Sequence, residues 1–148
     1  MAIVSWNIYW NEYSFETYLY GSEITFHQKE HVEFKNTLMP PSSVIKTWYS
    51  KVNYQMKRVE PSLPMIDGES RYHLSTQLEI EDKGNVLVKI TFYDRYENEA
   101  GFQIMRGKEI DFTCPLKTYS YTIQLIHAGS THFHFHSMKL TEYSNEDK

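Results

Sequence analysis

The sequence has 148 residues, of which 41% are hydrophobic, 16% aromatic and 23% charged, proportions that are typical of one folded globular domain. The 15 Lys and Arg against 19 Asp and Glu give a net charge of −4 without a basic cluster, which argues against a nucleic-acid-binding surface. The single cysteine, Cys114, excludes an internal disulfide framework and a multi-thiolate metal cluster built from this chain alone.

The sequence also bears on the cellular compartment. No basic segment precedes a sustained apolar stretch at the start of the chain, and no run of about 18 consecutive apolar residues occurs. A lone cysteine fits a reducing compartment. We therefore expect a cytoplasmic protein that does not insert into the membrane, while docking on a membrane-bound partner stays open.

Strands are predicted throughout the first third of the chain, at residues 4–10, 18–26, 32–34 and 44–54. Prolines flank the last of these segments, at Pro40-Pro41 before it and at Pro61 and Pro64 after it. Proline lacks the amide hydrogen of a strand ladder, so these positions fit breaks between strands.

Apolar and polar residues alternate most regularly over residues 72–80 and again over residues 86–93, which predicts two half-buried strands. Gly84 lies between them and can adopt a positive φ, so we expect the two strands to form a hairpin. A second hairpin is expected for residues 102–104 and 110–114, around the turn at Arg106-Gly107.

Two further strands are predicted, one ending at His127 and one over residues 131–140. About ten short strands without helical periodicity predict an all-β fold, an antiparallel β-sandwich or jelly roll. We expect one domain over residues 1–142 and a polar tail over residues 143–148. The side chains expected to face the core of the sandwich are Leu74, Leu78, Ile80, Val88, Ile90, Phe92, Ile123 and Leu125.

A histidine motif stands out near the end of the chain, where His132, His134 and His136 alternate with Phe133 and Phe135. Alternate residues of a strand share a face and lie about 6.6–6.8 Å apart, so two imidazoles can converge on one metal ion. A third ligand would have to come from another strand or chain, and His127 is the most available candidate. The favoured interpretation is that the phenylalanines fill the core and the histidines face solvent without a metal.

Aromatic residues crowd the first twenty positions and the segment around Trp48. Sugars stack on exposed aromatic rings, and protein partners bury the same residue types. We therefore take Trp10, Trp48, Tyr54 and Arg58 as candidate ligand-binding residues, while core packing remains the alternative for each ring.

Catalytic signatures are absent from the sequence, which has no Gly-x-Ser-x-Gly, His-Glu-x-x-His, Gly-x-Gly-x-x-Gly or phosphate-binding Gly-Lys-Ser/Thr motif. Cys114 follows the apolar alternation and is expected to be buried rather than reactive. The acidic segment 94–99 lacks the spacing of a calcium loop and is predicted to be a solvated turn. We expect no enzymatic activity and no cofactor.

Several segments together resemble the third accessory Sec protein family, which belongs to the accessory Sec export system of Gram-positive bacteria. They are WNIYW (6–10), TYLYGS (17–22), FKNTLMPP (34–41), WYSKVNYQ (48–55), LP (63–64), KITFYDR (89–95) and YSYTIQL (119–125). The resemblance implies a β-sandwich similar to carbohydrate-binding modules. It also implies a non-catalytic role with two larger accessory Sec proteins in the export and glycan processing of serine-rich repeat adhesins.

The partners implied by this resemblance are the two larger accessory Sec proteins. The adhesin, its glycans and the accessory Sec motor are further partners that the resemblance leaves open. The implied location is cytoplasmic, and peripheral contact with the membrane through the translocon stays open. Two other functions remain: a free-standing carbohydrate-binding module, and a small metal-dependent jelly-roll enzyme built on His132, His134 and His136.

Overall fold

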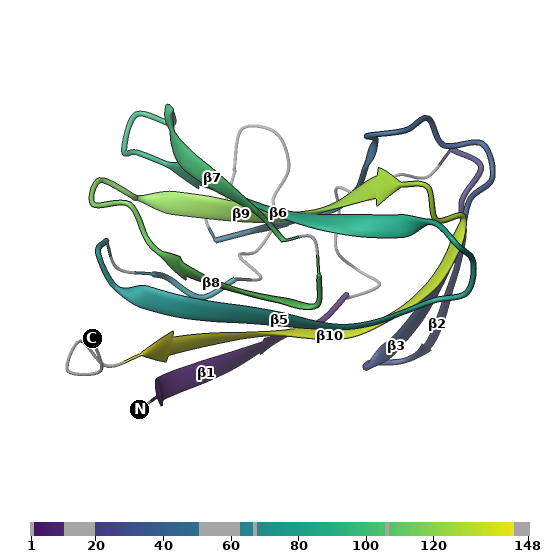
Figure 1. The fold of residues 1–148 in the computed structure, drawn as a ribbon, viewed down its shortest axis with the longest axis horizontal. Coiled ribbons are helices and arrows are strands. Elements are labelled where there is room, and N and C mark those ends of the chain that lie inside the picture. Colours follow the sequence, from purple (N-terminus) through teal and green to yellow (C-terminus); the bar gives the residue numbers. More distant parts are fainter. Residues whose placement is uncertain (1, 11–19, 51–62, 67, 106, 144–148) are drawn as a thin grey trace.

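The computed structural model describes residues 2–10, 20–50, 63–66, 68–105 and 107–143. These residues form ten strands and no helix, so no helix in this part of the chain could cross a membrane. The strands make two antiparallel sheets that pack face to face (Figure 1), which confirms the predicted all-β sandwich. The strands are β1 (Ala2–Ile8), β2 (Glu23–Gln28), β3 (His31–Lys35), β4 (Val44–Tyr49), β5 (Arg71–Ile80), β6 (Asn85–Tyr93), β7 (Glu99–Met105), β8 (Glu109–Thr113), β9 (Ser120–Ala128) and β10 (His132–Tyr143).

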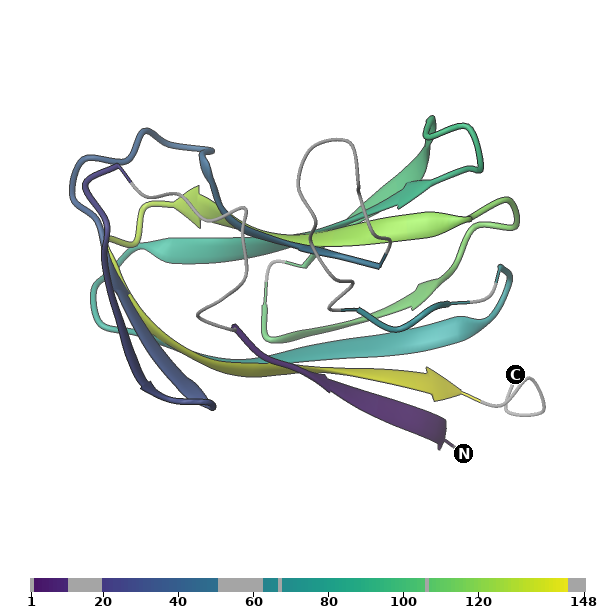
Figure 2. The same cartoon turned by 180° about the vertical axis from the view of Figure 1, so that it is seen from behind.

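The larger sheet has the order β2-β3-β10-β5-β8, with β1 also paired to β10, and the smaller sheet has the order β4-β9-β6-β7. β10 pairs with β5 along one edge. Along its other edge it pairs first with β3, at Phe133 opposite Phe34, and then with β1, at Leu140 opposite Trp6. Figure 2 shows from behind how β2 and β3 flank the first half of β10 and β1 flanks the second half.

β10 contains a bulge that changes which of its side chains face the core. Phe135 lies opposite Leu78, but Ser137 lies opposite Gln77, so His136 is the extra residue. The inward-facing positions are therefore odd before the bulge, at Phe133 and Phe135, and even after it, at Met138 and Leu140. An unpaired residue of this kind shifts the alternation by one position and bends the strand.

Both hairpins predicted from the sequence are wrong. β5 and β6 lie in opposite sheets, and so do β7 and β8. The chain crosses the sandwich at each of these connections, and again between β9 and β10. The hairpins that do form join β2 to β3 and β6 to β7, the latter through the turn at residues 94–98, where Oδ1 of Asp94 accepts hydrogen bonds from the amides of Tyr96 and Asn98.

Two of the crossing connections touch each other at one end of the sandwich. A Cβ on Gly84 would lie 2.1 Å from the carbonyl carbon of Gly129, so only glycine fits at that position. The carboxylate of Asp82 accepts hydrogen bonds from the amide and hydroxyl of Thr131, at 2.6 and 3.0 Å, and from the amide of Gly84, at 3.2 Å. Desolvation alone would raise the pKa of Asp82, but these hydrogen bonds and one from Ser130 outweigh it and lower the pKa to about 2.

The core lies between the sheets and contains most of the side chains that the alternation predicted. Leu74, Val88, Ile90, Phe92, Ile123 and Leu125 are buried, and Leu78 and Ile80 are partly buried against the same cluster. Cys114 is buried as expected, with 1% of its surface exposed. β10 runs through Tyr143, while the rest of the predicted tail, residues 144–148, lies outside the described part.

Candidate functional site

Five of the seven histidines of the chain gather on the outer face of the larger sheet, where β2, β3 and β10 lie side by side. We call this group, together with Glu33, the histidine cluster: His27, His31, His132, His134, His136 and Glu33. Phe133 and Phe135 have no exposed surface, and because side chains of a strand alternate between its faces, the histidines between them point outward. This placement confirms the packing expected from the sequence.

Glu33 lies at the centre of one half of the cluster. Its two carboxylate oxygens accept hydrogen bonds from Nε2 of His132, at 2.6 Å, and from Nε2 of His27, at 2.9 Å. These two hydrogen bonds lower the pKa of Glu33 to about 2. Glu33 is therefore a carboxylate at neutral pH and holds β2 and β10 against β3 at this position.

His31 connects the other half of the cluster. Its Nε2 lies 2.9 Å from Nδ1 of His134, and its ring stacks on that of His136 with 5.1 Å between the ring centres. Desolvation first, and then the neighbouring imidazoles, lower the pKa of His31. Nδ1 of His136 in turn donates a hydrogen bond to the carbonyl oxygen of Glu30, at 2.8 Å.

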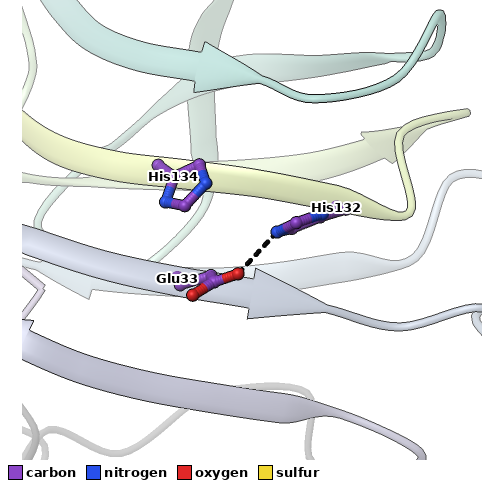
Figure 3. A group of neighbouring side chains, drawn as sticks. All are labelled: Glu33, His132 and His134. Atoms are coloured by element: carbon purple, nitrogen blue, oxygen red, sulfur yellow. Dashed lines mark hydrogen bonds and ion pairs between the residues drawn. The ribbon is translucent and has the colours of Figure 1, made fainter.

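Three members of the cluster bring metal-binding atoms together. One donor atom each from Glu33, His132 and His134 lies within 4.8 Å of the others. Figure 3 shows the three side chains on the same side of β3 and β10, with Glu33 and His132 joined by their hydrogen bond. The side chains of Glu33 and His134 are only 18% and 17% exposed, so the sheet shields them from most of the solvent.

His127 does not take part in this arrangement, although the sequence made it the first choice for a third ligand. It lies on β9 in the smaller sheet and is 93% buried, with 7% of its surface exposed. Glu33 stands in its place and comes from β3, the neighbour of β10. A search for polar residues that alternate with apolar ones in the preceding strands would have found His31 and Glu33, which flank Val32.

The structure places Trp10 and Trp48 in the core, with 2% and 1% of their surface exposed. Their rings meet edge to face, with 6.4 Å between the ring centres, and both contact Phe135. Nε1 of Trp48 donates a hydrogen bond to the carbonyl oxygen of Tyr9, at 2.9 Å. Neither ring exposes a face on which a sugar could stack. Both rings therefore pack in the core, which was the alternative to ligand binding considered in the sequence analysis. Tyr54 and Arg58 lie outside the described residues.

Exposed rings lie elsewhere, at the end of the sandwich where the β6–β7 turn meets the segment before β9 (Figure 1). Tyr96, Leu116 and Tyr119 are 77%, 65% and 61% exposed. We call these three residues the end patch. They line an open hollow of about 410 Å³ together with Asp94 and Arg95 and two neighbours. Large apolar side chains grouped on a surface are typical of sites that bind other proteins or ligands.

Comparison with known protein families and sequences gives concordant results. Residues 17–142 match the family model described as accessory Sec secretory system ASP3. The accessory Sec system protein ASP3 of Streptococcus gordonii is 38% identical over 130 residues, which are 88% of this chain and 82% of that protein. The protein of the same description in Staphylococcus aureus is 28% identical over 142 residues, 96% of this chain and 44% of that protein.

Two solved structures of accessory secretory or glycosylation-associated proteins also contain a chain similar to this one. The Glycosylation Associate Protein (Gap123) complex from Streptococcus agalactiae contains a chain that matches with a TM-score of 0.86 and 38% identity, over 97% of this chain and 46% of that one. The structure of accessory secretory protein 1, 2 and 3 in Streptococcus pneumoniae contains a chain that matches with a TM-score of 0.86 and 33% identity, over 93% of this chain and 96% of that one. This chain thus spans less than half of the matched Streptococcus agalactiae chain.

A more distant match concerns the fold alone. The CBM22-1 and GH10 modules of the Clostridium thermocellum xylanase 10B, complexed with xylohexaose, match with a TM-score of 0.51 and 12% identity, over 95% of this chain and 25% of that one. The similarity to a carbohydrate-binding module that the sequence implied is therefore present in the arrangement of the strands.

Proposed function

Since the chain belongs to the accessory Sec secretory system ASP3 family, we propose that it is a non-catalytic subunit of an accessory Sec complex, which it forms with the two larger accessory Sec proteins. One observation carries this proposal. The fold covers 96% of a chain in a solved assembly of accessory secretory proteins 1, 2 and 3, with a TM-score of 0.86. A chain that reproduces almost the whole length of a subunit is expected to occupy the same place in its own complex.

The proposed role of this complex is to support the export and glycan processing of serine-rich repeat adhesins, in the cytoplasm or at the inner surface of the membrane through the translocon. In this role the subunit needs binding surfaces and no reactive group. The buried thiol of Cys114 and the lack of hydrolase or nucleotide-binding motifs in the sequence support a non-catalytic role.

The end patch is the surface that we propose for contact with a larger subunit. Interfaces concentrate their binding energy in a few aromatic or large apolar residues that become fully desolvated. Tyr96, Leu116 and Tyr119 provide such residues around one hollow, and the charged residues Asp94 and Arg95 also line it. A hollow lined by both apolar and charged residues allows a partner to insert an apolar side chain and to pair charges beside it.

The alternative of a free-standing carbohydrate-binding module has less support. Its main candidates, Trp10 and Trp48, are buried, and the likeness to the xylanase module is one of fold alone. Titration of glycans against the isolated chain and against the assembled complex separates the two functions. A module that acts alone binds equally well in both titrations.

Reconstitution tests the proposal directly. We expect the chain to elute with both larger accessory Sec proteins in size-exclusion chromatography at micromolar concentration. The double variant Leu116→Ala with Tyr119→Ala is expected to weaken the complex by about tenfold or more, as truncation of central interface residues does. The matched control is Tyr20→Ala with Leu38→Ala, which removes a tyrosine and a leucine that are 75% and 63% exposed near β2, at the opposite end of the sandwich (Figure 1).

Absence of a complex at that concentration would contradict the proposed function. A complex weakened by the control pair and unaffected by the change in the end patch would leave the subunit role in place. It would move the contact surface to the other end of the molecule.

A further inference from the structure

We propose that the outer face of the larger sheet binds one divalent transition-metal ion, best matched by Zn²⁺, through Glu33 of β3 and His132 and His134 of β10. This site is separate from the end patch and from the subunit role proposed above. All three side chains lie on the outer face of the sheet, away from the core and from the end patch, although Glu33 and His132 already join β3 to β10 by a hydrogen bond. The role of the ion is structural: it would fasten β3 to β10.

The spacing of the donor atoms is close to that of a zinc site. Ligand atoms bound at about 2.0–2.2 Å to a tetrahedral Zn²⁺ lie about 3.4 Å from one another. The donor atoms of the three residues are all within 4.8 Å of one another, and Nε2 of His132 is 2.6 Å from Oε2 of Glu33. Replacement of that hydrogen bond by a shared ion moves these two atoms apart by less than 1 Å on this arithmetic, which side-chain rotation alone can supply.

The types of ligand select among metals. Two imidazoles and one carboxylate suit zinc and other transition metals, whereas Mg²⁺ and Ca²⁺ prefer six or more oxygen ligands. Three protein ligands leave one tetrahedral position open to water or to a fourth donor. His31 is a further imidazole of the cluster, with its Nε2 2.9 Å from Nδ1 of His134.

The surroundings also resemble those of a metal site. Nε2 of His134 lies 3.0 Å from Oε1 of Glu81. A carboxylate at that nitrogen keeps the proton on Nε2 and leaves Nδ1 unprotonated. The lone pair of Nδ1 accepts a hydrogen bond from Nε2 of His31, which binding of the metal would replace. Ligating histidines typically have their second nitrogen against a carboxylate or carbonyl in this way. Nε2 of His27 holds the other oxygen of Glu33, at 2.9 Å, and so orients the carboxylate.

Another histidine on the same outer face, His73, lies outside the cluster and shows what the cluster adds. His73 of β5 lies 2.6 Å from Oδ1 of Asp111 and 3.6 Å from Oε2 of Glu109, so it has carboxylates on both sides. It forms no group of three metal-binding side chains within the described residues. His73 therefore provides a matched control, because it is a surface histidine paired with carboxylates on the same sheet.

The test uses the full chain, freed of any affinity tag and treated with a chelator, and titrated with Zn²⁺ alone by isothermal calorimetry. We expect one ion per chain and a rise in the thermal midpoint with Zn²⁺ but not with Mg²⁺, since an ion that binds only the folded state stabilises it. Glu81→Gln removes the carboxylate that orients His134 and is expected to lower the affinity for Zn²⁺ by about tenfold. His132→Ala, His134→Ala and Glu33→Gln remove ligands and are expected to lower it further, whereas His73→Ala leaves it unchanged.

Circular dichroism and the thermal midpoint in the presence of the chelator show whether each variant is folded before zinc is added. Visible absorption of the Co²⁺-loaded chain provides a second readout, because tetrahedral Co²⁺ absorbs far more strongly than octahedral Co²⁺. The proposal is overturned if the unaltered chain binds no Zn²⁺. It is also overturned if His73→Ala weakens binding as much as His132→Ala does, which would mean that zinc binds surface histidines without selectivity.

Discussion

Trp48 lies at the centre of an aromatic group between the sheets, in contact with Trp10 and Phe135, and 1% of its surface is exposed. We expect Trp48→Ala to lower the free energy of unfolding by about 3–5 kcal/mol, because it removes a large buried side chain and leaves a cavity. Chemical denaturation monitored by circular dichroism measures this change. Tyr20→Ala, at a residue that is 75% exposed, is expected to stay within about 0.5 kcal/mol. A Trp48 variant as stable as the Tyr20 variant would contradict the position of Trp48 in the core.

Asp82 provides a second test at the level of a single residue. Its pKa of about 2 is below the value of about 4 for an unfolded chain, so its stabilising effect is complete above pH 4 and is lost as the pH falls from about 4 to about 2. We expect Asp82→Asn to lower stability by about 1 kcal/mol at pH 7, since water screens this exposed carboxylate. The difference in thermal midpoint from the unaltered chain is expected to shrink at pH 3.

The exposed Glu99 is the control for this pH series. Glu99→Gln removes a carboxylate at the start of β7 and is expected to leave the thermal midpoint within about 1–2 °C of the unaltered chain, as surface substitutions usually do. If Asp82→Asn behaved in the same way at every pH, the hydrogen bonds of Asp82 to Thr131 and Gly84 would have no net effect on stability.

The histidine cluster shows how far single residues can be interpreted from the sequence. The alternation of His132, Phe133, His134 and Phe135 predicts correctly which side chains face out. It cannot predict that β3 lies beside β10, because about a hundred residues separate Glu33 from His132 in the chain. Glu33 could therefore be identified as the third donor only from the register of the sheet, in which His134 lies opposite Glu33.

At the level of the strands, alternation of apolar and polar residues located most elements but did not identify their partners. Residues 72–80 and 86–93 were predicted as two strands and are β5 and β6 within a residue at each boundary. Each of these two strands presents one apolar face to the core. Two neighbouring strands of one sheet do so, and so do two strands that face each other across the sandwich. The pattern therefore could not distinguish a hairpin from the crossing connection that the structure has.

Gly84 makes that crossing possible, and its substitution tests it. We expect Gly84→Ala to lower the free energy of unfolding by about 1–3 kcal/mol, because the new methyl group would overlap the backbone of Gly129 and Ser130, and an overpacked site strains its neighbours. Gly107→Ala is the matched control, since a Cβ there meets nothing within 4 Å. Equal stability of the two variants, measured by urea denaturation, would mean that the two connections are not in close contact.

At the level of the whole molecule, composition and strand pattern indicated a single β-sandwich, and the resemblance of seven segments indicated its family. The segments are rich in aromatic and turn residues such as Trp10, Trp48 and Asn36, which the structure buries. Asn36, for example, donates hydrogen bonds to the carbonyl of Tyr20 and the hydroxyl of Ser22. The family pattern thus records how this sandwich packs, so it identified the fold and the relatives but did not identify a binding surface.

β10 also determines when the larger sheet can form as the protein is made. It pairs with β1, β3 and β5, all of which leave the ribosome before it, and its contacts with β1 join residues at nearly opposite ends of the sequence. Proteins dominated by contacts between residues far apart in the sequence fold slowly. Until its partner has been synthesised, a strand exposes an edge that can pair with other chains. Synthesis at about 5–20 residues per second therefore leaves β1 and β3 unpaired with β10 for several seconds. During that interval the edges of β1 and β3 that later pair with β10 are open to pairing with other chains.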